Sequence, residues 1–87
     1  MEVQWTKKAI KEAKYLHQKD RESYNKLKEL IAEIEQTPFT GTGKPEPLKH
    51  QLKGWWSRRI NQKDRLVYRV SGKTPQILVI ASCRGHY

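Results

Sequence analysis

The sequence predicts an α+β fold: a short strand, two helices, and then an antiparallel sheet with both helices packed on one face. Two apolar patterns and the segment that separates them predict this fold class. Apolar residues recur at helical spacing across residues 7–36 and then alternate from residue 55 onward, and a segment rich in proline and glycine separates the two patterns. The 87 residues leave room for one small core, so we expect residues 1–87 to form a single domain.

The N-terminal half contains a strand and two helices. Residues 2–5 are typical of a short strand, and Thr6 can cap a helix that begins at Lys7. The apolar stripe of this helix comprises Ile10, Ala13 and Leu16, widened by Ala9 and Tyr15. Asp20 is the candidate cap of the second helix, whose stripe comprises Tyr24, Leu27, Leu30, Ile31 and Ile34. Pro38 ends this helix because the residue before a proline is pushed out of the helical region.

The remainder of the chain is an ordered loop followed by strands. The loop spans residues 37–50, and its segment Gly41-Thr42-Gly43-Lys44 lacks the spacing of a phosphate-binding loop. Strands are expected over residues 55–60, 65–70 and 76–83. The last of these is apolar on both faces, which predicts an interior strand.

The register of the first hairpin follows from its alternation. The apolar alternates on the core side are Leu66, Tyr68 and Val70 in one arm, and Trp56 and Ile60 in the other. Placing both sets on one face pairs Ile60 with Leu66, because a slip by one residue would turn one set outward. Arg58 falls on the core side in this register, and we expect it at the sheet edge.

The opposite side of the hairpin is basic. Arg59, Arg65 and Arg69 share it with Trp55 and Ser57, and we call it the arginine face. The whole chain has 18 Lys and Arg against 9 Asp and Glu, a net charge of +9, which indicates a polyanionic partner. A basic surface that only confers solubility is the alternative. No apolar run is long enough to span a membrane and no signal peptide is evident, and the single Cys83 suits the reducing cytosol.

Cleavage of RNA through its own 2′-hydroxyl needs a base, an acid and cations that stabilise the phosphorane. Glu46, between two prolines, can be the base, and His86 can be the acid because the unperturbed pKa of histidine is about 6.5. The phosphate charge can be held by Arg59, Arg65 and Lys49.

Each assignment has a structural alternative. Glu46 could be a solvated loop acid, the arginines a solvated strand face, and the terminal His86-Tyr87 a frayed end. Trp55 could pack or stack on a base; since it lies on the arginine face, it is counted with Arg69 among the candidate RNA-binding residues. A metal site has no support, because no CxxC or HxxxH spacing exists.

Five segments carry a resemblance to a known family. They are Thr37-Pro38-Phe39, Gly43-Lys44-Pro45-Glu46-Pro47-Leu48-Lys49-His50, Gly54-Trp55-Trp56-Ser57-Arg58-Arg59-Ile60, Arg65-Leu66-Val67-Tyr68 and Cys83-Arg84-Gly85-His86-Tyr87. Across essentially the whole chain they resemble the YoeB toxins of the RelE/ParE superfamily. The second segment and the terminal His-Tyr are specific to that branch.

The resemblance implies a microbial RNase-like β-α-α-β-β-β fold. It also implies a toxin of a type II toxin–antitoxin system in the bacterial cytoplasm, acting as a ribosome-dependent endoribonuclease without cofactor. This mRNA interferase would cut mRNA in the ribosomal A site and be neutralised by an acidic antitoxin of the YefM type. A homodimer is a further possible assembly. The implied roles are general base for Glu46, general acid for His86, transition-state stabilisation for Arg65, phosphate support for Lys49 and Arg59, and substrate orientation for Tyr87.

Two rival functions remain from the sequence. Some toxins of the same superfamily poison DNA gyrase, but they do not need a Glu-His pair, so Glu46 and His86 argue against that function. A non-catalytic basic module that binds RNA or the ribosome would explain the charge of +9 equally well. RNA binding without cleavage products would identify such a module.

Overall fold

Two side chains decide where the helices begin. In the computed structural model, which describes residues 1–85, the Thr6 hydroxyl accepts a hydrogen bond from Ala9 N at 3.1 Å and caps α1 (Lys7–Lys19). Asp20 Oδ1 accepts from Ser23 N at 3.1 Å and caps α2 (Arg21–Gln36). Both caps and the end of α2 before Pro38 confirm the predictions, because capping depends only on residues close in sequence.

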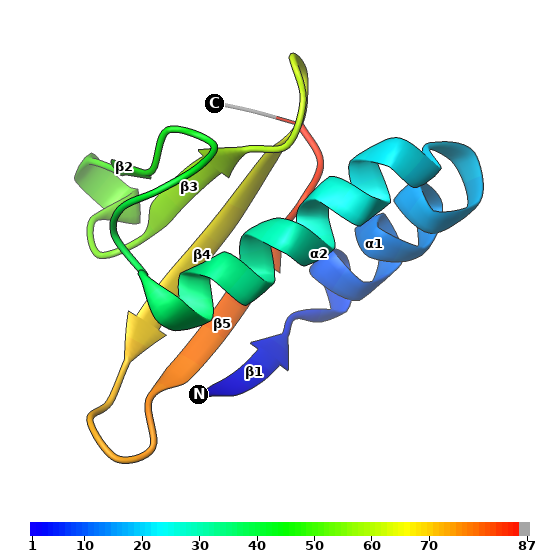
Figure 1. Ribbon diagram of the computed structural model, residues 1–87. Helices are drawn as coiled ribbons and strands as arrows, with labels where there is room; N and C mark the ends of the chain where they lie inside the picture. Colours follow the sequence, from blue (N-terminus) through cyan, green and yellow to red (C-terminus); the bar gives the residue numbers. More distant parts are fainter. Residues whose placement is uncertain (86–87) are drawn as a thin grey trace.

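A five-stranded sheet lies behind the two helices (Figure 1). Its strands follow the order β1-β5-β4-β3-β2. They are β1 (Glu2–Trp5), β2 (Glu46–Pro47), β3 (Trp56–Arg59), β4 (Arg65–Ser71) and β5 (Ile77–Ser82), and a short 3-10 helix, η1 (His50–Leu52), follows β2. The α+β class is confirmed, and β5 is an interior strand as its apolar faces predicted.

Two features of the sheet differ from the prediction. Strands β2 to β5 are antiparallel, but β1 pairs with β5 in parallel, so the sheet is mixed. A parallel neighbour needs a long connection, and the two helices supply one between β1 and the rest of the sheet. The predicted loop 37–50 also contains β2, which pairs with β3 through Glu46 opposite Ser57 and Pro47 opposite Trp56.

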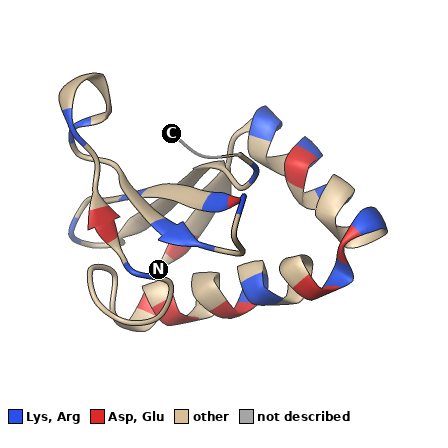
Figure 2. Ribbon diagram, turned by 90° about the horizontal axis from the view of Figure 1, so that it is seen from above, with Lys and Arg blue, Asp and Glu red and all other residues tan. Residues whose placement is uncertain are grey.

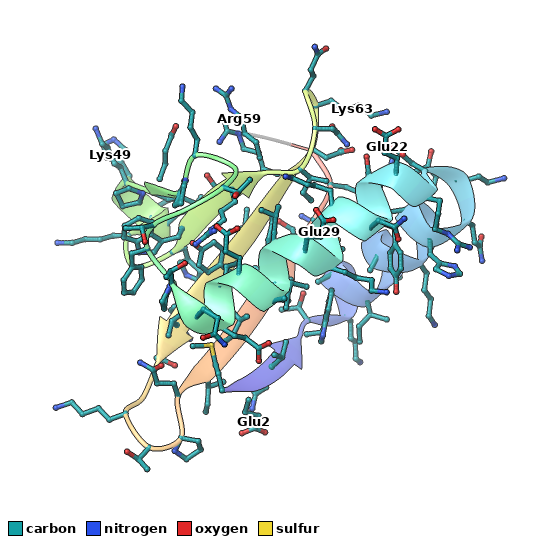
Figure 3. All side chains as sticks on the ribbon, viewed as in Figure 1. Glu2, Glu22, Glu29, Lys49, Arg59 and Lys63 are labelled. Atoms are coloured by element: carbon teal, nitrogen blue, oxygen red, sulfur yellow. The ribbon has the colours of Figure 1, made fainter. Side chains whose placement is uncertain are left out.

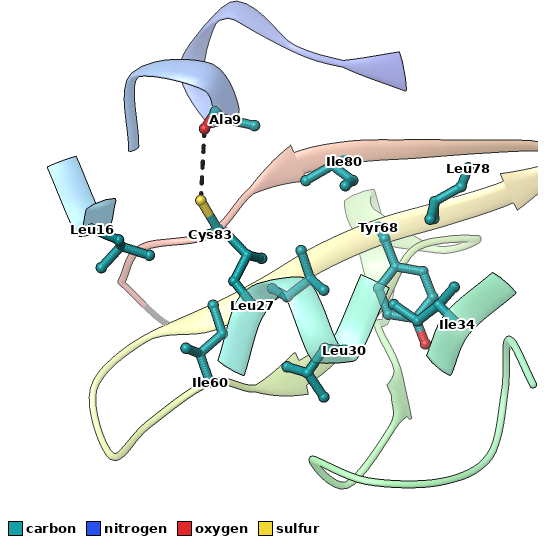
Figure 4. Close-up of a cluster of buried hydrophobic side chains, with 11 residues drawn as sticks. Ala9, Leu16, Leu27, Leu30, Ile34, Ile60, Tyr68, Leu78, Ile80 and Cys83 are labelled. Carbon is teal, nitrogen blue, oxygen red and sulfur yellow. Dashed lines mark hydrogen bonds between the residues drawn. The ribbon is translucent and has the colours of Figure 1, made fainter. Parts of the chain in front are cut away.

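The core lies between the helices and the sheet (Figure 4). The stripe of α2 faces the core as predicted, with three of its five residues buried and Tyr24 and Ile31 partly buried. Ala9 and Leu16 of α1 are buried with it. Ile10 and Tyr15 were expected in the stripe of α1, but both side chains are 42% exposed. The predicted stripe was too wide, because the buried residues of α1 are those that face α2 and β5, namely Ala9 and Leu16.

The register of the hairpin differs from the prediction by two residues. Trp56 pairs with Tyr68 and Arg58 with Leu66, and Ile60 N donates to Asp64 O at 3.0 Å. The turn explains the difference, because Asn61 Oδ1 accepts from Lys63 N at 2.9 Å and from Asp64 N at 2.8 Å and so closes a tighter loop. A shift by an even number keeps every side chain on its predicted face.

Arg58 is not at the sheet edge, where the sequence placed it, but fully buried. Its five N–H groups meet five acceptors, which is the full donor capacity of a guanidinium. They are Tyr68 Oη (3.1 Å), Glu33 Oε1 (2.9 Å), and the carbonyl oxygens of Thr42 (3.3 Å), Thr37 (2.7 Å) and Thr40 (2.9 Å). A charged group is tolerated in the core because no donor is left unpaired.

The partners of Arg58 are held in turn. Tyr68 donates its hydroxyl proton to Pro38 O at 2.7 Å, and burial raises the pKa of this phenol, so it stays a neutral donor. The Glu33 carboxylate accepts from Thr42 N, and this hydrogen bond, with a smaller contribution from Arg58, holds the pKa of Glu33 below its ordinary value of 4.5. Arg58 therefore connects β3, the end of α2 and the loop 37–42.

Replacing Arg58 by methionine should destabilise the protein strongly. The change removes the donors of several carbonyl groups at once, and breaking a buried ion pair from one side costs about 3–5 kcal/mol. The matched control is Arg59→Met, one residue further along β3, where the side chain is exposed and about ±0.5 kcal/mol is expected. Urea unfolding measures both. Equal midpoints and slopes for the two variants would contradict a structural role for Arg58.

The contribution of Glu33 should depend on pH. Because its folded-state pKa is lowered, the stabilisation is complete above 4.5 and is lost as the pH falls through the folded-state pKa. The difference in free energy of unfolding between the wild type and Glu33→Gln should therefore be constant near neutral pH and shrink in acid. Denaturant titrations at a series of pH values measure it. A difference that grows in acid would refute the assignment.

Candidate active site

Strand pairing places Glu46 on the arginine face. Residues directly opposite in an antiparallel pair point to the same side, so Glu46 lies on the side of Ser57. Ser57 in turn accepts a hydrogen bond from Arg65 Nη1 at 3.4 Å. The exposed carboxylate and the guanidinium thus emerge from one face of the sheet, the face away from the helices.

Arg59 and Arg65 face each other across β3 and β4. Together with Asn61 and Gln62 they line a pocket of about 240 Å³ at the end of the hairpin. Arg59 is exposed and Arg65 is half-buried, and the backbone of Arg59 is fixed because its N–H donates to Gly43 O at 2.7 Å. Two guanidinium groups beside a small pocket form an anion-binding arrangement suited to a phosphate.

Arg69 and Trp55 form a stacked pair on the same face. The guanidinium carbon of Arg69 lies 4.7 Å from the centre of the Trp55 ring. Trp55 is half-buried and Arg69 is exposed. The pairing explains why an aromatic ring lies among the cations of the arginine face.

Lys49 lies outside this paired region. It precedes η1, its side chain is exposed, and its carbonyl accepts from Leu52 N at 3.1 Å. Figure 3 shows Lys49 and Arg59 projecting outward from the part of the molecule built by β2, η1 and β3. In Figure 2 acidic and basic residues are mixed along α2, whereas α1 carries five lysines and one glutamate. The charged residues of β3 and β4 are all arginines.

The chain leading to the C-terminus is attached to α1 and to the hairpin. Cys83 N donates to Glu12 Oε1 at 2.9 Å, the Arg84 guanidinium lies 3.6 Å from the centre of the Tyr15 ring, and Arg65 N donates to Gly85 O at 2.9 Å. Burial raises the pKa of the Cys83 thiol to about 12, so this cysteine is an inert core residue. The predicted His86 and Tyr87 lie outside the described residues.

Two residues beside the site were missed from the sequence. Asn61 closes the hairpin turn, and the buried Asp64 accepts from Gly85 N at 2.9 Å. The spacing Asn-x-x-Asp at the end of a strand is a turn signal that could have identified the first. The second could not be found, because its partner is 21 positions away.

The described residues offer little for other kinds of site. Among residues 1–85, no group of three or more His, Cys, Asp and Glu is placed to hold a metal ion. Within the same range, no helix is long and apolar enough to cross a membrane. The arginine face itself presents the Glu46 carboxylate, guanidinium groups and the ring of Trp55.

The chain matches known proteins over its full length. A family model for YoeB-like toxins of bacterial type II toxin–antitoxin systems covers residues 5–87. Toxin YoeB of Escherichia coli K12 is 46% identical over 87 residues, covering 100% of both chains. A YoeB/ParE toxin structure from Agrobacterium tumefaciens has a TM-score of 0.96 at 42% identity, also covering 100% of both.

YoeB of Staphylococcus aureus is similar in structure as well. Its dimer gives a TM-score of 0.90, and a heterotetrameric YoeB–YefM complex gives 0.88. Both are 39% identical and cover 100% of this chain and 98% of that chain. With the family model matching almost every residue, the chain belongs to the YoeB-like toxins of bacterial type II toxin–antitoxin systems.

Proposed function

We propose that this toxin is a ribosome-dependent endoribonuclease that cuts mRNA in the ribosomal A site. The observation that carries the proposal is the position of Glu46 on the arginine face, on the same side of the sheet as Arg59 and Arg65. A base and phosphate-binding cations on one surface are two of the three requirements of cleavage through the 2′-hydroxyl. The third, an acid, comes from the C-terminal segment, whose last described residue is hydrogen-bonded to Arg65.

The reaction uses protein side chains alone. Glu46 takes the proton of the 2′-hydroxyl, and the oxygen attacks the adjacent phosphorus. Arg65 stabilises the charge of the resulting phosphorane, with Lys49 and Arg59 supporting the phosphate. The bond to the 5′-oxygen then breaks and His86 donates a proton to it, which leaves a 2′,3′-cyclic phosphate and a free 5′-hydroxyl. Tyr87 orients the substrate.

The rest of the arginine face has a binding role in this proposal. Arg69 and Trp55, already stacked on one another, would contact RNA next to the reacting phosphate. We propose that the same face is covered in the resting state by an acidic antitoxin of the YefM type. Staphylococcus aureus YoeB has been solved both in complex with YefM and as a dimer, which supports an antitoxin partner and a homodimer for this chain.

The function is tested by mapping new RNA 5′ ends after brief induction in a bacterium. Cleavage inside translated codons that stops when translation is blocked is expected for the wild type. Glu46→Gln and Arg65→Ala should each lose about 10²–10⁴-fold in rate, the typical effect of such groups, and should leave the thermal midpoint nearly unchanged.

Glu35→Gln is the matched control, because it removes the same charge from an exposed position on α2. It should cut RNA at the wild-type rate. Near wild-type cleavage by Glu46→Gln would show that the base is another group. Ribosome binding without any new 5′ ends from the wild type would favour the non-catalytic module.

Removing His86 and Tyr87 should separate catalysis from folding. The apolar pattern of β5 ends before these residues, so the truncated protein should melt close to the full-length chain and still bind ribosomes. Cleavage should collapse, His86→Ala should lose most of it, and Tyr87→Ala should lose part. Thermal midpoint, toxicity and ribosomal cleavage are measured side by side. A truncated protein that remains fully toxic would end the idea of a catalytic tail, and one that unfolds would make the tail structural.

A further inference from the structure

A chain of polar side chains connects α2, the hairpin turn and the C-terminal segment. Ser23 Oγ donates to Asp20 Oδ2 at 2.7 Å, and Asn61 Nδ2 donates to Ser23 Oγ at 2.7 Å and to Asp64 Oδ2 at 2.9 Å. Asp64 Oδ1 completes the chain by accepting from Gly85 N at 2.9 Å. The start of α2 and the segment before the C-terminus thereby come together at the turn between β3 and β4 (Figure 1).

Asp64 is the centre of this chain. It is 3% exposed, and each of its carboxylate oxygens has a different donor. Its backbone takes part as well, because Asp64 O accepts from Ile60 N and Asp64 N donates to Asn61 Oδ1. A buried carboxylate with both oxygens hydrogen-bonded holds its donors in place, since losing either bond would leave a charged oxygen unpaired.

Gly85 is held from both sides. Its N–H is bonded to Asp64, and its carbonyl accepts from Arg65 N, the next residue along β4. Its φ of +79° lies in the left-handed region that favours glycine, and no atom lies within 4 Å of where a Cβ would be. The two hydrogen bonds and the backbone conformation therefore hold Gly85 next to Arg65, one of the residues that line the pocket at the end of the hairpin.

We infer that Asp64 is a positioning residue that, through its bonds to Asn61 and Gly85, places the C-terminal segment against Arg65. The inference rests on the proposed function, in which Arg65 stabilises the phosphorane and the segment after Gly85 supplies the acid. Asp64 touches no reacting atom; it fixes the spacing between two groups that do. A misplacement of about 1 Å can cost on the order of 10²-fold in rate, so this spacing matters for catalysis.

The chemistry of the pair Asn61–Asp64 allows a sharp test. In Asp64→Asn the new amide has one oxygen and one NH2 group in place of two oxygens, so it can accept from Gly85 N only by turning its NH2 toward the NH2 of Asn61. Flipping Asn61 would not help, because its oxygen already accepts from two backbone N–H groups. The single variant must therefore lose one of the two bonds. Because Ser23 and the turn hold Asn61 in place, we expect it to lose the bond from Gly85 N.

The double variant Asn61→Asp/Asp64→Asn exchanges the two groups. The new carboxylate at position 61 can accept from the amide at position 64 and from the turn, and the amide oxygen is free to accept from Gly85 N. The bond from Asn61 to Ser23 is given up, which lowers the melting midpoint without affecting Gly85. Glu35→Gln again serves as the control for loss of one negative charge.

Two measurements decide the inference. Hydrogen exchange of the Gly85 amide should be slowed in the wild type, fast in Asp64→Asn and slowed again in the double variant. Single-turnover cleavage on ribosomes should fall on the order of 10²-fold in Asp64→Asn, with ribosome affinity unchanged, and recover in the double variant. If Asp64 only stabilised the fold, the single and the double variant would both melt at a lower temperature, and the cleavage rate would not recover in the double variant.

The outcomes separate the two proposals. Unchanged exchange at Gly85 in Asp64→Asn, or fast exchange with an unchanged cleavage rate, would overturn the positioning role. A wild-type protein that cuts no RNA would overturn the proposed function, and with it the catalytic consequence of Asp64. The exchange of the Gly85 amide would then still decide whether Asp64 anchors the C-terminal segment.

Discussion

The buried guanidinium of Arg58 is the constraint on which the loop 37–42, which precedes Glu46, depends. A charge without exposure to water must have every donor paired, and the acceptors come from the helix end, the loop and β4. Three carbonyl groups of the loop 37–42 are consequently held by hydrogen bonds from this one side chain. Four residues after this loop, Glu46 pairs with Ser57 at the edge of the sheet, so the candidate base lies close in sequence to the segment that Arg58 holds.

A second polar network holds another peripheral segment in place at the N-terminal end of α2. Glu33, near the C-terminal end of this helix, pairs with Arg58, whereas Asp20 and Ser23 at its N-terminal end lead through Asn61 to Asp64. Hydrophobic residues are only 36% of the chain, and a small core leaves the periphery of a domain weakly held. The two networks attach the loop 37–42 and Gly85, which lie outside the core cluster.

The arginine face differs from these networks because its cations are left accessible. Arg59 and Arg69 are exposed, and within residues 1–85 the Arg65 guanidinium donates one long hydrogen bond, of 3.4 Å, to Ser57. Such a surface favours any dense array of negative charge. In the proposed function this property serves twice, because the phosphates of RNA and an acidic antitoxin would compete for the same cations. Inhibition would then require no separate regulatory site.

The sequence by itself determined the elements, their caps and the faces of the strands. Thr6, Asp20 and Pro38 act on neighbours a few residues away, and alternation assigned Arg59, Arg65 and Arg69 to one face without knowledge of the register. Only the tertiary structure decided the parallel pairing of β1, the burial of Arg58 and the anchoring of Gly85 by Asp64. The physical reason is that a buried charge or a strand pair is stabilised by partners distant in sequence. Local periodicity predicts which face of an element is buried, but not which distant residue packs or bonds against it.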